Sequence, residues 1–262
     1  MKKRAMTSTD ASLKKIGGHL HEYDFAECIG GEVNQGGQTD KKDVIDKKHR
    51  IYSVKGGTWW QVFLYGRARF ESNTAFKGLG NLSALMIECI DAFPAEWEQY
   101  KKDKMRAKTG LQRPMKLLCA ELNKPNMLAA FFNKALFNGG EVSYLSILPK
   151  ELGEKQASAK IFHVFFHADV ERVLSENIEV VNSRARNPLQ TDAQKVIFRL
   201  ARNVGEIEIR TDSKLHHRQA KCRINGPDIL ALLQKHLGPG VEVRRQVMAY
   251  GAATKSLRDL AG

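Results

Sequence analysis

The spacing of the apolar residues changes along this chain and limits its fold. In residues 76–137 apolar side chains recur every three or four positions, as in "LSALMIECIDAF" and "PNMLAAFFNKALF", which predicts helices. Residues 8–29 also predict a helix, weakened at Gly17-Gly18, and 226–237 another that stops at Gly238. Strand-like runs lie at 141–149 and 160–170 and in "KVIFRLAR", "GEIEIRT", "QAKCRIN" and "VEVRRQVMAYG". We therefore expect a mixed α/β (α+β) fold and not a parallel doubly wound one.

A polar, glycine-containing segment at 149–160, "PKELGEKQASAK", is the best candidate for a boundary. We expect residues 1–150 to form a core with a helical insertion at about 76–137. Residues 151–262 are expected to form a β-rich C-terminal portion, either as a second domain or as part of one continuous domain.

The charge of the chain favours a polyanionic partner. Forty-two Lys and Arg against 29 Asp and Glu leave a net charge of +13, which favours nucleic acid first and an acidic membrane surface second. No run reaches the roughly 18 apolar residues of a membrane helix. "MKKRAMTSTDASLKK" lacks the apolar stretch of a secretory signal, and the four cysteines are scattered without C-x-x-C spacing. These features predict a cytoplasmic protein with no membrane partner.

The stretch "KKDVIDKKHRIYSVKGG", residues 41–57, predicts a β-hairpin with functional groups at its open end. Residues 43–46 and 50–55 form the two strands, "KKH" the turn, and Gly56-Gly57 the stop. Folding back brings Asp43 near Ser53 and Lys55, which share one face of their strand. A carboxylate beside an ammonium fits metal-dependent phosphodiester hydrolysis, because the acid holds a hard divalent ion and the lysine steadies water or phosphate.

These residues resemble the active-site hairpin of the PD-(D/E)XK nucleases, the superfamily that includes most type II restriction endonucleases. Asp43 matches the aspartate of the motif and Lys55 its lysine. Lys42 stands where the proline is expected, and Ser53 where the family has an acid. The resemblance implies a restriction-endonuclease-like core, a central mixed sheet flanked by helices, and one or two Mg²⁺ ions.

The departure at Ser53 matches an S-x-K variant of the family, in which the second acid comes from the following helix. We expect a helix over "WWQVFLYGRARFES", capped by Thr58, and Glu71 is the first acid after Lys55. Asp43 and Glu71 are the predicted metal ligands. Further candidates are Gln61 on the same segment, Asp46 or Asp40 in place of Asp43 after a register shift, and Glu32.

A second cluster competes for the active site. Asp212 is followed by the triplet Gln219-Ala220-Lys221, and some nucleases of this superfamily use Q-x-K. The spacing is shorter and Asp212 falls at a turn, so the hairpin at 41–57 ranks first.

The C-terminal portion holds side chains suited to DNA. Arg can hydrogen-bond guanine, and Asn or Gln adenine, through two bonds in the major groove. The predicted DNA-contacting residues are Arg184, Arg186, Asn187, Gln190, His216, His217, Arg218, Gln219, Lys221 and Arg223.

These features together favour a Mg²⁺-dependent, sequence-specific endonuclease of double-stranded DNA, a type II restriction enzyme. The resemblance implies a homodimer on a palindromic site. "GGEVNQGG" is not followed by GK[ST], so no nucleotide triphosphate is expected as a partner. The alternatives are a structure-specific repair or recombination nuclease of the same fold and a non-catalytic basic DNA-binding protein.

Overall fold

The computed structural model describes residues 8–34, 41–72, 75–149, 160–185 and 191–261. Its contacts group the chain into two compact units, each assembled from separate segments. Unit 1 comprises Met1–Thr58, Gly140–Val170 and Leu230–Gly262, and unit 2 comprises Trp59–Gly139 and Glu171–Ile229. The predicted division at residue 150 stays a prediction.

Unit 1 contains a mixed seven-stranded sheet. Two neighbouring pairs, β3 with β5 and β6 with β12, are parallel, and the other neighbours are antiparallel. In spatial order the strands are β1 (Glu32–Val33), β2 (Val44–Ile45), β3 (Ile51–Gly56), β5 (Tyr144–Leu148), β6 (Phe162–Phe166), β12 (Val247–Tyr250) and β11 (Val241–Arg244).

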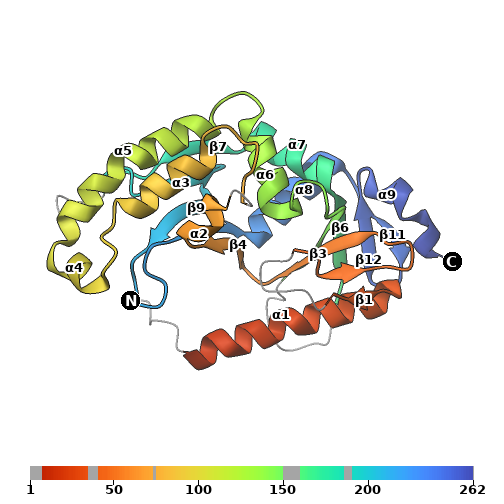
Figure 1. Ribbon diagram of the computed structural model, residues 1–262. Helices are drawn as coiled ribbons and strands as arrows, with labels where there is room; N and C mark the ends of the chain where they lie inside the picture. The colour runs from red at the N-terminus through yellow and green to blue at the C-terminus, as the bar shows by residue number, and fades with distance from the viewer. Residues whose placement is uncertain (1–7, 35–40, 73–74, 150–159, 186–190, 262) are drawn as a thin grey trace. The chain divides into compact units, whose positions relative to one another are not determined.

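Helix α1 (Ser8–Ile29) lies alongside β1 and β3 and packs on one face of this sheet (Figure 1). Phe25 on α1 is fully buried and meets the rings of Tyr52 on β3 and Phe162 on β6. Leu257 joins the same core after α9 (Ala253–Ser256), which the 3₁₀ turn Arg258–Ala261 follows. The helix is continuous through Gly17-Gly18, so it is not broken there, and its weakening at these glycines stays a prediction.

Unit 2 contains a five-stranded antiparallel sheet with helices on its apolar face. In spatial order the strands are β4 (Trp59–Tyr65), β10 (Gln219–Asn225), β9 (Asn203–Arg210), β8 (Lys195–Arg199) and β7 (Glu179–Asn182). The helices are α2 (Arg67–Glu71), α3 (Leu82–Asp91), α4 (Trp97–Lys102), α5 (Lys104–Leu122) and α6 (Met127–Phe137), with α3 and α5 side by side (Figure 1). Phe131 and Phe198 meet in the core between helices and sheet. Two further helices, α7 (His167–Asn177) and α8 (Gly226–Leu237), each contain a boundary between the units.

The mixed α/β class is confirmed, but two local expectations are wrong. The segment expected as one helix over residues 59–72 is strand β4 followed by the short α2. Exposed Trp59 and Gln61 alternate with buried Trp60 and Val62, a strand period that pairing with β10 stabilises. The strand expected over 160–170 ends at Phe166, where α7 begins. A short apolar run such as residues 59–65 is compatible with a helix or a strand, and here the pairing with β10 makes it a strand.

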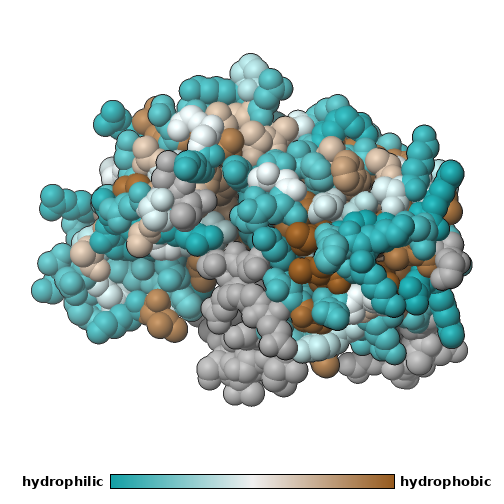
Figure 2. Space-filling view, turned by 45° about the vertical axis from the view of Figure 1, so that its right-hand side comes forward, coloured by the Kyte–Doolittle hydropathy of each residue, from teal (hydrophilic) through white to brown (hydrophobic). Residues whose placement is uncertain are grey.

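Hydrophilic residues cover most of the face shown in Figure 2, with hydrophobic residues in small groups between them. The largest exposed apolar side chains are dispersed over several elements, for example Leu20 on α1 and Leu215 before β10. None of the helices in the described ranges has the length and apolar character that a bilayer crossing requires.

Candidate active site

The turn of the β2–β3 hairpin is fixed by Asp46. Its backbone N donates to Arg50 O at 3.1 Å, and its Oδ1 accepts the backbone N–H groups of Lys48 and Arg50 at 2.9 and 3.0 Å. His49 adopts a positive φ of 60° and donates its N–H to Asp46 O. An aspartate that hydrogen-bonds the backbone two residues on is a strong turn former. The turn sets the register of the two strands and confirms the predicted hairpin.

At the open end of the hairpin three donors converge on one oxygen of Asp43. Oδ2 accepts from Ser53 Oγ at 3.1 Å, from the Val54 backbone N at 2.7 Å and from Lys55 Nζ at 3.0 Å. Strand β2 begins only at Val44, so the Asp43 carboxylate takes the place of a strand carbonyl for the Val54 N–H. The structure therefore brings together Asp43, Ser53 and Lys55, as the sequence predicts.

This cluster lies on the face of the sheet that α1 does not cover. Tyr52 and Val54 belong to the core that includes Phe25, whereas Ser53 and Lys55 alternate to the opposite side. The side chains of Asp43 and Lys55 are 15% and 21% exposed, and that of Ser53 is buried. The ion pair is thus held at the open end of the hairpin and is partly exposed to solvent.

Asp43 Oδ1 has no hydrogen-bond or ion-pair partner among the described residues. One carboxylate oxygen is therefore open to a cation. Magnesium is commonly held by one or two carboxylates together with waters and substrate phosphates. In the described part of the chain no three His, Cys, Asp or Glu side chains gather as a metal cage. The residues fit a hydrated Mg²⁺ that completes its shell with phosphate, and they do not fit a cage built only of protein.

Asp46, the alternative to Asp43, is saturated by structural contacts. Its Oδ2 accepts from Arg50 Nε at 2.6 Å and from Tyr52 Oη at 3.0 Å, and its side chain is buried. Arg50 also holds Asp259, and hydrogen bonds from Arg50 and Lys48 keep the pKa of Asp259 well below its usual range. Burial first, and then the charge of Asp46, raises the pKa of Tyr52. Asp46 therefore anchors the hairpin, and Asp43 is the acid that keeps an oxygen open to a cation.

The proposed second acid, Glu71, lies in unit 2. It ends helix α2 and accepts a hydrogen bond from Arg67 Nε at 2.8 Å, with its side chain 48% exposed. Gln61 is also in unit 2, on β4 opposite Arg223. Glu32 is exposed on β1, opposite Ile45. The roles of these three side chains at the site stay predictions.

In the competing cluster, Asp212, Gln219 and Lys221 each bind a different partner. Arg210 binds Asp212 through two hydrogen bonds of 3.0 and 2.7 Å, and Lys221 Nζ lies 3.5 Å from Glu208. The Gln219 amide oxygen meets His216 Nδ1 at 3.0 Å. The Asp212–Gln219–Lys221 pattern in the sequence therefore does not produce an acid–lysine pair like that of Asp43 and Lys55.

The other predicted DNA-contacting residues that the structure describes fall into three groups. His217 and Arg218 are half-buried; His217 packs on Trp97, and Arg218 bonds Asp91 at 2.5 Å. Arg223 lies over the exposed Trp59 ring at 4.9 Å and also bonds Glu206. Arg184 is exposed and lines a pocket in unit 2. Four residues of the sequence analysis lie outside the described ranges: Asp40, Arg186, Asn187 and Gln190.

The sequence analysis did not predict two clusters of polar side chains that the structure shows. On unit 1, His163 Nδ1 meets Tyr250 Oη at 2.7 Å, and Gln234 Nε2 donates to the same hydroxyl at 3.0 Å. Register places His163 beside Ile147, which lies beside Lys55 on the same face. On unit 2, the pocket around Arg184 joins α5 to strands β7–β9. The alternation in "GEIEIR" signals one charged face of β9, but the pairing of distant strands has no local signal.

Comparison with family models, with curated proteins and with solved structures gave no significant match to this chain.

Proposed function

We propose that this chain is a Mg²⁺-dependent endonuclease of double-stranded DNA whose active site is the open end of the β2–β3 hairpin. The observation that carries the proposal is the convergence of Ser53, Val54 N–H and Lys55 on a single oxygen of Asp43. That arrangement fixes the carboxylate and leaves its second oxygen free. A type II restriction enzyme of the PD-(D/E)XK class is the specific form we propose.

The topology around the hairpin supports this class. The two strands of the motif lie in a mixed sheet, β3 continues into a parallel pair with β5, and α1 backs the face opposite the acid and lysine. A restriction-endonuclease-like core is expected to have a central mixed sheet flanked by helices. We therefore propose the finer fold as well, with unit 1 as the catalytic core.

Each residue has a distinct chemical task in the proposed reaction. Asp43 holds the cation, and Ser53 and the Val54 N–H keep its carboxylate in one orientation. Lys55 supplies a positive charge for the attacking water or the scissile phosphate. Bound Mg²⁺ supplies Lewis-acid stabilisation of the charge that develops on phosphate oxygens. Glu71 remains the proposed second ligand.

The remaining parts of the proposal follow from charge and symmetry. The net charge of +13 favours DNA as the polyanion, and a homodimer suits a palindromic site. We also propose a cytoplasmic location.

One observation favours the alternative of a non-catalytic DNA-binding protein: the described residues place a single acid beside Lys55.

The test is digestion of unmethylated phage DNA with Mg²⁺ or with EDTA. Wild-type protein is compared with Lys55→Ala and with Lys47→Ala, a control that removes an exposed lysine from the turn of the same hairpin. We expect discrete bands with Mg²⁺, their loss in Lys55→Ala and their retention in Lys47→Ala.

Other outcomes discriminate between the alternatives. Smears in place of bands, still dependent on Lys55, would indicate a structure-specific or end-dependent nuclease. Binding without cleavage by any preparation would replace the enzyme by a binding protein. Cleavage that survives Lys55→Ala would remove the active site from this hairpin.

A further inference from the structure

Helix α5 carries a run of basic side chains that no acid in the described ranges neutralises. Asp103 caps the helix by accepting the Arg106 backbone N–H at 2.9 Å, and Glu121 near the other end pairs with Lys124. Between these acids all of the charged side chains are basic and lie at least partly exposed. They are Lys104, Arg106, Lys108, Arg113 and Lys116.

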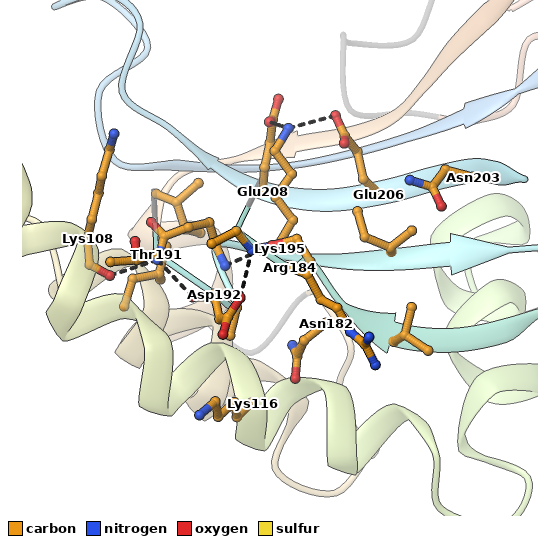
Figure 3. A pocket seen from close by; sticks show the side chains of 18 of the residues that line it. Lys108, Lys116, Asn182, Arg184, Thr191, Asp192, Lys195, Asn203, Glu206 and Glu208 are labelled. Atoms are coloured by element: carbon orange, nitrogen blue, oxygen red, sulfur yellow. Dashed lines mark hydrogen bonds and ion pairs between the residues drawn. The ribbon is translucent and has the colours of Figure 1, made fainter. Parts of the chain in front are cut away.

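Two of these lysines line a pocket of about 930 Å³ in unit 2 (Figure 3). Helix α5 contributes Lys108 and Lys116, and the end of β7 and the segment after it contribute Asn182 and Arg184. Strands β8 and β9 contribute further charged side chains, namely Lys195, Glu206 and Glu208. The pocket therefore joins a basic helix to the charged face of an open sheet.

The acids that line the pocket are Asp192, Glu206 and Glu208, and each has a hydrogen-bond or ion-pair partner: Asp192 Oδ1 accepts the Ala185 N–H. Lys195 lies between Glu206 and Glu208 and pairs with both, as Figure 3 shows. Arg223 also binds Glu206. Burial would raise the pKa of Glu208, but the hydrogen bond and charge of Lys195 and the charge of Lys221 outweigh it, and the pKa is lowered. Glu208 therefore stays ionised and paired.

Three basic side chains that line the pocket are not paired with an acid in the described part of the chain. Within the described residues Lys108, Lys116 and Arg184 form no ion pair, and Figure 3 shows no interaction of their charged groups with the other residues drawn. Arg184 is nevertheless held close to the helix, because Asp192 accepts the Ala185 N–H at 2.6 Å and Gln194 donates to Lys108 O at 2.8 Å. The three charges are therefore without an ion pair among the described residues, although Asp192 lines the same pocket.

The spacing of these charges selects the kind of anion. Lys108 and Lys116, the two basic residues of α5 that line the pocket, are eight residues apart, which corresponds to roughly 12 Å along a helix. A single phosphate spans less than that. Duplex DNA carries one negative charge per about 1.7 Å of its axis and could contact both lysines and Arg184.

We propose that Lys108 and Lys116 of α5, with Arg184, form a binding surface for the phosphate backbone of duplex DNA. This surface belongs to unit 2, whereas the hairpin of Asp43 and Lys55 belongs to unit 1. It rests on the proposed function only for the choice of DNA as the polyanion. Its contacts position the duplex and carry no sequence information.

The test measures the salt dependence of binding to a labelled 30-base-pair duplex in Ca²⁺, with Lys108, Lys116 and Arg184 all changed to Gln. The control variant changes Lys77, Lys235 and Lys255 to Gln, which removes the same charge from exposed positions elsewhere. Since each lost phosphate contact lowers the slope of log K against log [salt] by about 0.9, we expect a loss of roughly 2 to 3 in the first variant and little change in the control.

The loss should be equal on a cognate and an unrelated duplex. Unchanged slope in the first variant, or equal losses in both variants, would overturn the proposal. Thermal melting verifies that each variant is folded. Failure of the proposed function is recognised separately, as absence of cleavage by wild-type protein that still binds through this surface.

Discussion

Lys55 Nζ lies 3.0 Å from Asp43 Oδ2 and 3.2 Å from the carbonyl oxygen of Val54, its own neighbour. The lysine is thus bent back over its strand toward the carboxylate. Because the Ser53 hydroxyl and the Val54 N–H bind the same carboxylate oxygen, Asp43 keeps two donors if Lys55 turns to a phosphate or a water. The acid is held by the strand, and the lysine is the part of the pair that can exchange partners.

Replacing Asp43 by Asn should abolish cleavage and moderately destabilise the protein. The amide keeps the shape but loses the charge that a cation and Lys55 require, so we expect cleavage to fall by about a hundredfold or more. The hydrogen bonds to Ser53 and Val54 weaken, which should cost about 1–3 kcal/mol of unfolding free energy. Cleavage assays and urea unfolding measure the two effects, and retained activity in a folded Asp43→Asn variant would exclude Asp43 as the ligand.

Replacing Asp46 by Asn should lower the free energy of unfolding more than Asp43→Asn does, and should affect cleavage less. Asp46 is buried and binds Arg50, Tyr52 and the turn backbone. Removing one charge of a buried pair costs about 3–5 kcal/mol, more than we expect for Asp43. The folded fraction at low temperature should still cleave DNA. Complete loss of cleavage by folded Asp46→Asn, with activity left in Asp43→Asn, would exchange the roles of the two acids.

The sequence predicted the hairpin, its turn and the meeting of Asp43 with Lys55, because these depend on residues within about a dozen positions. Alternation and turn-forming residues carry that information. The nature of residues 59–65 could not be predicted in the same way. Their adjacent tryptophans suit a helix or a strand, and the choice depends on β10, more than 150 positions away. The pocket of Arg184 was missed for the same reason, since α5 and β9 meet only after folding.

Replacing Glu71 by Gln tests the proposed second ligand. Its present partner is Arg67 in a surface pair, and such pairs contribute little, so stability should hardly change. We expect the Mg²⁺ concentration for half-maximal cleavage to rise about tenfold or more, as for loss of a metal-site group. Glu176→Gln is the matched control, because Arg172 and Glu176 form an exposed pair with the same spacing on α7. Equal Mg²⁺ requirements in both variants would remove Glu71 from the site.

Gly56 is predicted to be intolerant of a side chain. A Cβ at this position would lie 2.6 Å from Cδ2 of His21 on α1, at the end of the strand that carries Lys55. Gly56→Ala should therefore lower the unfolding free energy by about 1–3 kcal/mol. Gly110→Ala in the middle of α5 meets only an ordinary contact and should stabilise by about 0.5–1 kcal/mol.

His21→Ala in the Gly56→Ala background supplies the check on that explanation. Removing the ring should recover part of the lost stability, which urea unfolding of the four proteins in the cycle would show as a coupling between the two sites. Strictly additive effects would mean that the ring of His21 is not the obstacle.

Stability should fall in mild acid because of His163. Burial lowers the pKa of this histidine, whose ring meets Tyr250 and Gln234. The folded state then binds fewer protons than the unfolded state, where the pKa is about 6.5. Its contribution is complete above that value and is lost as the pH falls toward the lower folded pKa. His163→Gln should make the decline of the unfolding free energy between pH 7 and 5 less steep. Part of the decline should remain, because burial also lowers the pKa of His21. Urea unfolding across this range measures the slope, and an unchanged slope in the variant would show that another group causes the decline.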